Sequence, residues 1–272
     1  MYIQPSGKDA NEMIVREHDN SFIMIEQDNH AYVSGEIMKH WKASLFKGKN
    51  FKRSVDYAIY THDIGWAPFD KQPFWNDKDK APYTFVTFPP LPKITLYKNG
   101  IDKAEQHNSY AGLLCSEHYK RFLVNNTSEE AQDFIQQEEL RQQKIIDSTP
   151  GFQKEWFDFH YALVQLGDNI SLYICLNDPG TAKKDEHNFF KKGIPLAKAL
   201  DLSEKMHLLW ENDNTINIDP FPFDKPITFH LKQKEISKKD IAQYGLMEVY
   251  KNTPYDTLKM KLTSKYNNED ES

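Results

Sequence analysis

Three histidines and one aspartate lie on the apolar faces of predicted helices, where an imidazole or a carboxylate needs a partner. His30 begins one such face, His62 ends another, His107 begins a third, and Asp168 lies in a segment that is apolar nearly all round. An ionised carboxylate is costly to bury unless a cation or a strong donor pairs with it. Imidazole nitrogens and carboxylate oxygens together form a ligand set for a divalent metal ion. We therefore predict a buried metal site, against the alternative that backbone or carboxylate groups satisfy each histidine separately.

The pair His62-Asp63 is distinguished by its context. It follows Ile59 on the apolar face of a predicted helix, whereas a second pair, His18-Asp19, lies in a polar turn with no periodic apolar residues around it. Because the two pairs have the same composition, only their surroundings separate them. We predict that the first pair binds metal and that the second does not.

Helical periodicity and capping residues predict five helices, at 30–44, 51–62, 105–124, 128–147 and 153–176. The short loop between the first two favours antiparallel packing, which brings His30 and His62 to the same end of the helices. The long proline-rich segment 67–104 then returns the chain to His107, which we expect at that same end.

His118 follows His107 by 11 residues within one predicted helix. Along an unbroken helix that spacing is about 16 Å, whereas two metal ions in one site lie about 4 Å apart. The two histidines therefore cannot both belong to one compact cluster. We assign His107 to the site, treat His118 as a buried structural residue and expect one firmly held metal ion per chain.

Short strands are predicted at both ends of the chain, at 13–16, 21–26, 215–230 and 257–263. The expected fold is mainly α, in effect all-α, with a helical domain over 13–210 that carries an N-terminal β-hairpin. A β-containing C-terminal extension over 211–266 would pack on this domain. The two ends, 1–12 and 267–272, are predicted to be disordered.

The composition is that of a soluble globular protein. The chain has 272 residues, 39% of them hydrophobic, and 34 Lys and Arg against 40 Asp and Glu give a net charge of −6. That charge offers no overall basic surface for nucleic acid, and no segment is apolar enough to span a membrane. Cys115 and Cys175 lie in apolar stretches, as free thiols of a cytoplasmic protein do. We expect neither a membrane nor a nucleic-acid partner, and the oligomeric state is open.

The order of these residues resembles the motif of the HD-domain superfamily. His30 comes first, then His62-Asp63 within THDIGW, His107 within HNSYAGLL and Asp168 within LGDNISLY, over about residues 13–180. More narrowly, the chain resembles an uncharacterised bacterial family of unknown function. The resemblance implies an HD-like helical bundle holding one or two divalent ions. It also implies that His107 is the additional histidine of two-metal members and that the other four residues are the core ligands.

The resemblance further implies hydrolysis of phosphate esters or anhydrides. The expected function is a metal-dependent hydrolase of a small phosphorylated substrate, nucleotides included, in which Asp63 is both a ligand and the proton acceptor. Mn, Fe, Zn and Mg ions fit such a ligand set equally. Trp66 stands where many HD hydrolases have a lysine that faces phosphate, which leaves Arg141, Lys183 and Lys184 as candidate substrate-binding cations.

Two other functions remain open at this point. One branch of the HD superfamily consists of di-iron oxygenases with histidine and aspartate ligands. A non-catalytic module that binds a metal or a nucleotide is the second alternative, and it is favoured by Trp66 in place of the lysine.

Overall fold

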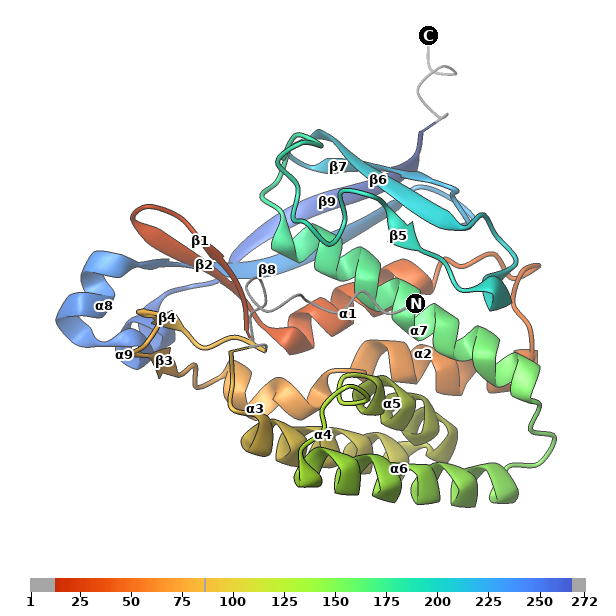
Figure 1. Cartoon of the computed structure of the whole chain (residues 1–272). Helices are drawn as coiled ribbons and strands as arrows, with labels where there is room; N and C mark the ends of the chain where they lie inside the picture. Colours follow the sequence, from red (N-terminus) through yellow and green to blue (C-terminus); the bar gives the residue numbers. More distant parts are fainter. Residues whose placement is uncertain (1–12, 86, 266–272) are drawn as a thin grey trace, which may run out of the picture.

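A curled, seven-stranded sheet forms one layer of the molecule (Figure 1). The computed structural model describes residues 13–85 and 87–265. In spatial order the strands are β1 (Ile14–Glu17), β2 (Ser21–Ile25), β8 (Ile227–Ser237), β9 (Asp256–Ser264), β7 (Thr215–Asp219), β6 (Lys205–Asn212) and β5 (Ile194–Pro195). Neighbouring strands are antiparallel except β7 and β9, which are parallel.

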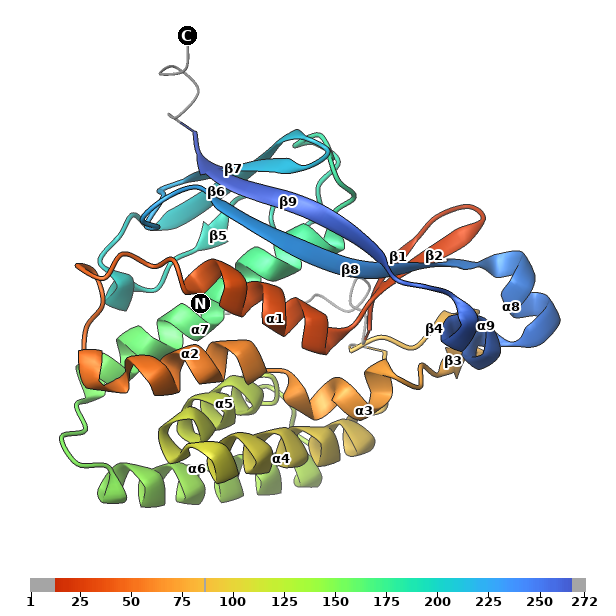
Figure 2. The same cartoon turned by 180° about the vertical axis from the view of Figure 1, so that it is seen from behind.

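Helices cover one face of this sheet in two layers. The longer helices are α1 (Gln27–Met38), α2 (Lys52–Thr61), α4 (Pro90–His107), α5 (Ser109–Arg121), α6 (Glu129–Ser148) and α7 (Lys154–Leu176). Of these, α1 and α7 lie nearest the sheet, and the other four lie beyond them (Figures 1 and 2). At the end of the sheet near β1 and β2 lie the short elements α3 (Ala67–Asp70), β3 (Trp75–Asn76), β4 (Ala81–Pro82), α8 (Lys238–Tyr244) and α9 (Leu246–Asn252).

The prediction of a mainly α, HD-like helical bundle is wrong, and so is its all-α form, because the sheet is a full layer of the fold. The physical reason is long-range pairing: Ser21 of β2 lies opposite Ser237 of β8, more than 200 residues away. Local sequence patterns predicted a hairpin at one end and an extension at the other. They could not show that both ends join one sheet. The domain boundary predicted after residue 210 falls inside β6.

Several individual elements are confirmed: the N-terminal hairpin, α2, α6 and α7 lie within one or two residues of their predicted bounds. The segment 67–104 contains α3 and most of α4, neither of which was predicted because of its prolines. Pro90 and Pro92 occupy the first turn of α4, where the backbone N–H groups have no intrahelical partner to lose. The residues 1–12 and 267–272, predicted to be disordered, lie outside the described part of the chain.

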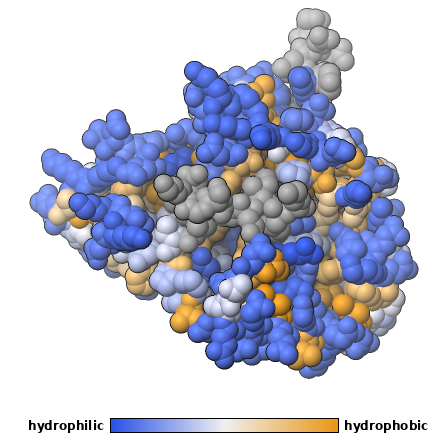
Figure 3. All heavy atoms as spheres, viewed as in Figure 1, coloured by the Kyte–Doolittle hydropathy of each residue, from blue (hydrophilic) through white to orange (hydrophobic). Residues whose placement is uncertain are grey.

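The core forms where the inner face of the sheet meets α1 and α7. Along β8, Ile227, Phe229 and Leu231 are buried and the residues between them are exposed, which is the alternation of a sheet with one covered face. Cys115 and Cys175 are free and buried. Within the described residues, no helix combines the length and apolarity needed to span a membrane. The face shown in Figure 3 is mostly hydrophilic, with apolar side chains near its middle, below the grey atoms.

The N-terminus of α1 is capped from another element. The carboxylate of Asp70, in α3, accepts hydrogen bonds from the backbone N–H groups of Gln27 (3.0 Å) and Asp28 (2.9 Å). Asp70 is 3% exposed and its bond to Gln27 is buried, so the Gln27 N–H has no acceptor to replace the carboxylate, whereas Asp28 is exposed. The contact sets the position at which α1 begins, one turn before His30.

We expect Asp70→Ala to destabilise the protein by about 1–3 kcal/mol, because it leaves two backbone donors of the first turn, one of them buried, without their acceptor. Urea denaturation measures this free energy of unfolding. The matched control is Asp77→Ala, at an exposed position nearby, which should change stability by less than about 0.5 kcal/mol. Equal stability of the two variants would contradict the capping role.

Candidate metal centre

Two histidines and two aspartates converge on one buried point. His30 Nε2 lies 3.1 Å from Asp168 Oδ1 and 3.3 Å from His62 Nε2. Asp63 Oδ2 lies 3.6 Å from His30 Nε2 and 3.8 Å from His62 Nε2, and His62 Nε2 is 3.6 Å from Asp168 Oδ1. Both histidines are fully buried, and the two aspartates are nearly so. The structure therefore brings together four of the five residues predicted to bind metal.

Three helices and a 3-10 turn supply these side chains. His30 lies in the first turn of α1, His62 ends α2, Asp63 precedes the 3-10 turn η2 (Ile64–Trp66), and Asp168 lies in the middle of α7. α1, α2 and α7 pack on one another in the centre of the molecule. His30 and Asp168 are therefore held within helices, and His62 and Asp63 form the short turn that joins α2 to η2.

Two glycines allow the helices to approach closely enough. A Cβ atom on Gly167, next to Asp168, would lie 2.4 Å from Ser34 Oγ of α1. A Cβ atom on Gly65, in the HDIG sequence, would lie 2.4 Å from the carbonyl oxygen of Leu96 in α4. Since both distances are far below van der Waals contact, larger residues at these positions would push α1 and α4 away from the cluster.

Hydrogen bonds on the outer nitrogens turn the inner nitrogens of both histidines into acceptors. His62 Nδ1 donates to the carbonyl oxygen of Ile59 (2.8 Å). His30 Nδ1 is 2.8 Å from Ser171 Oγ, whose own proton goes to a backbone carbonyl of α7, so the serine accepts from His30. When both rings are neutral, each Nε2 therefore carries a lone pair directed at the other and at the carboxylates. Four acceptors in contact require positive charge between them, either from a proton on a ring nitrogen or from a metal ion.

The distances fit a metal ion at this point. Ligand atoms bonded at about 2.1 Å to one ion are about 3.0 Å apart at right angles and about 3.4 Å apart at tetrahedral angles. Two of the five distances in the cluster, 3.1 and 3.3 Å, fall in this range, and the other three, 3.6 to 3.8 Å, are slightly longer. The residues present therefore fit a divalent ion with mixed nitrogen and oxygen ligands in their chemistry, and a small inward shift of the side chains would complete the spacing.

At three residues of the cluster, burial and the neighbouring groups of opposite charge shift the pKa in opposite directions. Burial alone would lower the pKa of His62, but Asp63 and Asp168 outweigh it and raise that pKa to about 9. Burial raises the pKa of Asp63 despite the nearby histidines. Hydrogen bonds with His30 and His62 overcome burial at Asp168 and hold its pKa well below the usual range. The centre thus favours positive charge, which either a proton or a metal ion can provide.

His118, predicted to be structural, lies against this cluster. Its Nε2 is 3.9 Å from Asp63 Oδ1, the oxygen turned away from His30, and neither ring nitrogen has a hydrogen-bond partner among the described residues. Burial, together with the charge of His62, lowers the pKa of His118 to about 3, so the ring is neutral and keeps a lone pair. An unpartnered, neutral, buried imidazole beside a carboxylate is suited to metal binding.

This set of ligand atoms suits one metal ion better than two. His62 Nδ1 is already bonded to a carbonyl, so a group made of His62, Asp63 and His118 would have to use the same His62 Nε2 atom as the first group. A separate second ion would keep only Asp63 Oδ1 and His118 Nε2 as ligands of its own. His118 is therefore better described as a fifth candidate ligand of a single centre.

His107 lies elsewhere. It is the last residue of α4, is exposed, and stacks on Tyr57 with 4.0 Å between ring centroids. The predicted helix 105–124 is in fact two helices, because Asn108 interrupts it and caps α5 with a bond from the backbone N–H of Ala111 (2.9 Å). With that break, the end of α5 that carries His118, and not the end of α4, reaches the cluster.

The three candidate substrate-binding cations also lie outside the cluster. Arg141 pairs with Asp102 and Glu105 of α4 and with Glu138 of its own helix, α6. Lys183 pairs with the buried Glu186 at 2.6 Å. Lys184 is exposed. None of the three lines the cavity next to the metal centre.

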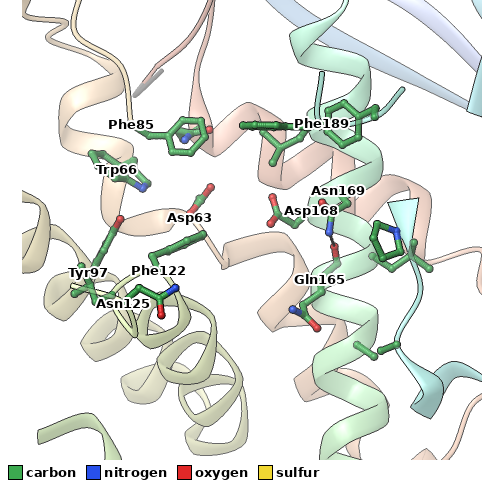
Figure 4. Close-up of a pocket in the computed structure, with 18 of the residues that line it drawn as sticks. Asp63, Trp66, Phe85, Tyr97, Phe122, Asn125, Gln165, Asp168, Asn169 and Phe189 are labelled. Carbon is green, nitrogen blue, oxygen red and sulfur yellow. Dashed lines mark hydrogen bonds between the residues drawn. The ribbon is translucent and has the colours of Figure 1, made fainter. Parts of the chain in front are cut away.

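That cavity opens directly onto the two aspartates. It has a volume of about 390 Å³, a size typical of small-molecule sites, and Asp63 and Asp168 face each other across it (Figure 4). Trp66 forms part of its wall, so the residue at the position of the HD lysine is an aromatic surface and not a cation. Gln27 also lines the cavity; it is 2% exposed, and its Oε1 has no partner among the described residues.

A family model described as "Protein of unknown function (DUF3891)" matches residues 13–238. The chain belongs to this family. The expected relationship to a family of unknown function is thereby confirmed, and the matched range includes every residue of the centre and of the cavity wall. No curated protein and no solved structure matches the chain.

His118 and Gln27 were not predicted as site residues, although the sequence contains an indication of each. Asn108-Ser109 is a typical helix start, and recognising it would have divided the helix and separated His107 from His118. Gln27 lies three residues before His30, so on a helix beginning at residue 27 the two share a face. That start was not predicted, because the cap of α1 comes from Asp70, far along the chain.

We expect His118→Ala to weaken metal binding by at least about tenfold, because it removes a ligand beside Asp63. His107→Ala, an exposed histidine only 11 residues away, is the matched control and should leave the affinity unchanged. Titration of chelator-treated protein with Mn²⁺, with elemental analysis of the bound ion, measures both. Loss of affinity in the His107 variant alone would overturn the placement of the fifth ligand.

Proposed function

We propose that this chain is a metal-dependent hydrolase of a small phosphate monoester. The observation that carries the proposal is the position of Asp63 and Asp168, which belong both to the cluster of converging lone pairs and to the wall of the cavity. A ligand in the cavity would therefore be in direct reach of a metal ion. The order His30, His62-Asp63, Asp168 along the chain also resembles the HD motif, and this supports hydrolysis, although the fold is not an HD bundle.

His30, His62, Asp63 and Asp168 would hold the ion, with His118 as the fifth ligand. A divalent ion bound there would supply a Lewis acid for a phosphoryl oxygen and would lower the pKa of water. Asp63 would accept the proton of the attacking water, since its carboxylate lies both in the cluster and at the cavity. Water supplies the new oxygen on phosphorus, the P–O ester bond breaks, and the products are inorganic phosphate and an alcohol.

The charges around the cavity favour a monoester over a polyphosphate. Lys93 is the only cationic side chain among the described residues that line it. Lys93 and Pro90 lie in the first turn of α4, so the positive end of a helix of 18 residues also faces the cavity. A divalent ion would balance the two aspartates, and even with Lys93 and this helix end the wall would offer a phosphate little further positive charge. The four negative charges of a triphosphate would remain largely uncompensated.

We expect the Mn²⁺-loaded protein to release phosphate from 1-naphthyl phosphate and Asp63→Asn to lower kcat by at least about 100-fold, because the amide cannot accept the proton. Asp19→Asn, in the exposed His18-Asp19 pair, is the matched control and should keep full activity. Phosphate release is the measurement, and thermal unfolding confirms that each variant is folded.

Full activity of Asp63→Asn would contradict the role of Asp63. Visible absorption of the iron-loaded protein, together with oxygen-dependent turnover and no phosphate release, would overturn the hydrolase assignment in favour of an oxygenase.

A further inference from the structure

The cavity continues well beyond the two aspartates, and its lining changes character there. On α7, Ala162 and Leu166 line it on the same side as Asp168. Ala162 is six residues from Asp168, or about 9 Å along the helix axis. The segment after β5 contributes Leu196, Ala197 and the buried Leu200. This part of the cavity offers contact surface but no charge.

Aromatic rings form much of the remaining wall. Figure 4 shows Phe85 and Phe189 on one side of the two aspartates, and Trp66, Tyr97 and Phe122 beside Asp63. They come from different elements: η2, the segment before α4, α4 itself, the end of α5 and the loop after α7. Rings gathered from five places around one cavity provide faces and edges on which another ring can pack.

Amide side chains, including Asn125 and Gln165, also line the wall, but the carboxylates are confined to one end, where Gln27 joins them. Gln27 occupies the first position of α1, one turn before His30, and its buried Oε1 is without a partner among the described residues. A buried amide oxygen that faces a cavity favours a ligand with an O–H or N–H donor at that place. The polar head of the ligand is therefore expected beside Gln27 and the aspartates, and its apolar body among the rings.

We propose that the cavity binds a monophosphate whose organic group is an uncharged aromatic ring system. Its phosphate lies at the end formed by Gln27, Asp63 and Asp168, and its rings pack between Phe85 and Phe189. This substrate class rests on the proposed hydrolase function, but binding of the organic group depends only on the cavity wall. A ligand that cannot be hydrolysed therefore tests it separately.

The probe is 1-naphthylmethylphosphonate, whose P–C bond is not hydrolysed, compared with methylphosphonate on the Mn²⁺-loaded full-length chain by isothermal titration calorimetry. We expect the naphthyl compound to bind at least about tenfold more tightly, because its rings bury apolar surface against the wall. Phe85→Ala should remove most of this advantage while methylphosphonate binding stays unchanged. Phe74→Ala is the matched control: it is in the same segment, is 48% exposed and does not line this cavity.

Equal affinity for the two phosphonates, or equal losses in the Phe85 and Phe74 variants, would overturn the inference. Tighter binding of n-octylphosphonate than of the naphthyl compound would overturn the aromatic assignment. Tight, Phe85-dependent binding of the naphthyl compound without phosphate release from 1-naphthyl phosphate would support the inference and contradict the hydrolase function. If the protein released phosphate from glycerol phosphate and from 1-naphthyl phosphate at equal kcat/KM and bound the two phosphonates equally, the hydrolase function would be supported and the inference about the aromatic group contradicted.

Discussion

Lone pairs directed at one buried point repel one another, and the centre of this protein is built around four of them. His30 and His62 each present Nε2 to the other at 3.3 Å, with Asp63 and Asp168 at 3.1 to 3.8 Å. Outer hydrogen bonds to Ser171 and to the carbonyl of Ile59 prevent the rings from turning away. Such an arrangement is stable only with positive charge at its centre. α1, α2 and α7 must therefore stay close enough to share one cation.

Other parts of the fold keep α1, α2 and α7 close together. Gly167 and Gly65 remove the side chains that would keep the helices apart. Asp70 fixes where α1 begins and therefore where His30 points. The sheet covers α1 and α7 on the side away from α2 and α5, so both helices are enclosed by packed residues. What remains open is the side where Asp63 and Asp168 reach the cavity.

Features that depend on residues close together in the sequence could be predicted. Features that depend on residues far apart in the sequence could not. Helical faces are local, so periodicity placed His30, His62, Asp63 and Asp168 correctly toward a common core. The choice between His107 and His118 failed because one cap, Asn108, shifts the helix boundary and exchanges which histidine faces inward. The sheet failed at longer range, because pairing of β2 with β8 joins residues more than 200 positions apart and leaves no periodic signal that connects them. The cap of α1 by Asp70 is likewise invisible in any short window.

Asp63 and Asp168 belong both to the cluster and to the cavity wall, so a molecule in the cavity would be in reach of an ion bound in the cluster. A structural metal is closed off from solvent by its ligands, whereas a catalytic one keeps a position open. Here the histidines are fully buried beneath, and the aspartates form the surface that a ligand would meet. Trp66, rather than a lysine, lies next to that surface, so under the proposed function rings would take over part of the recognition that charge provides elsewhere.

One divalent ion is expected at the point on which these lone pairs converge. Anomalous X-ray diffraction from crystals grown with Mn²⁺ and no chelator measures this directly. We expect a single strong peak within about 2.3 Å of His30 Nε2, His62 Nε2 and oxygens of Asp63 and Asp168. A peak at another place, or fully ordered side chains with no peak between them, would contradict it.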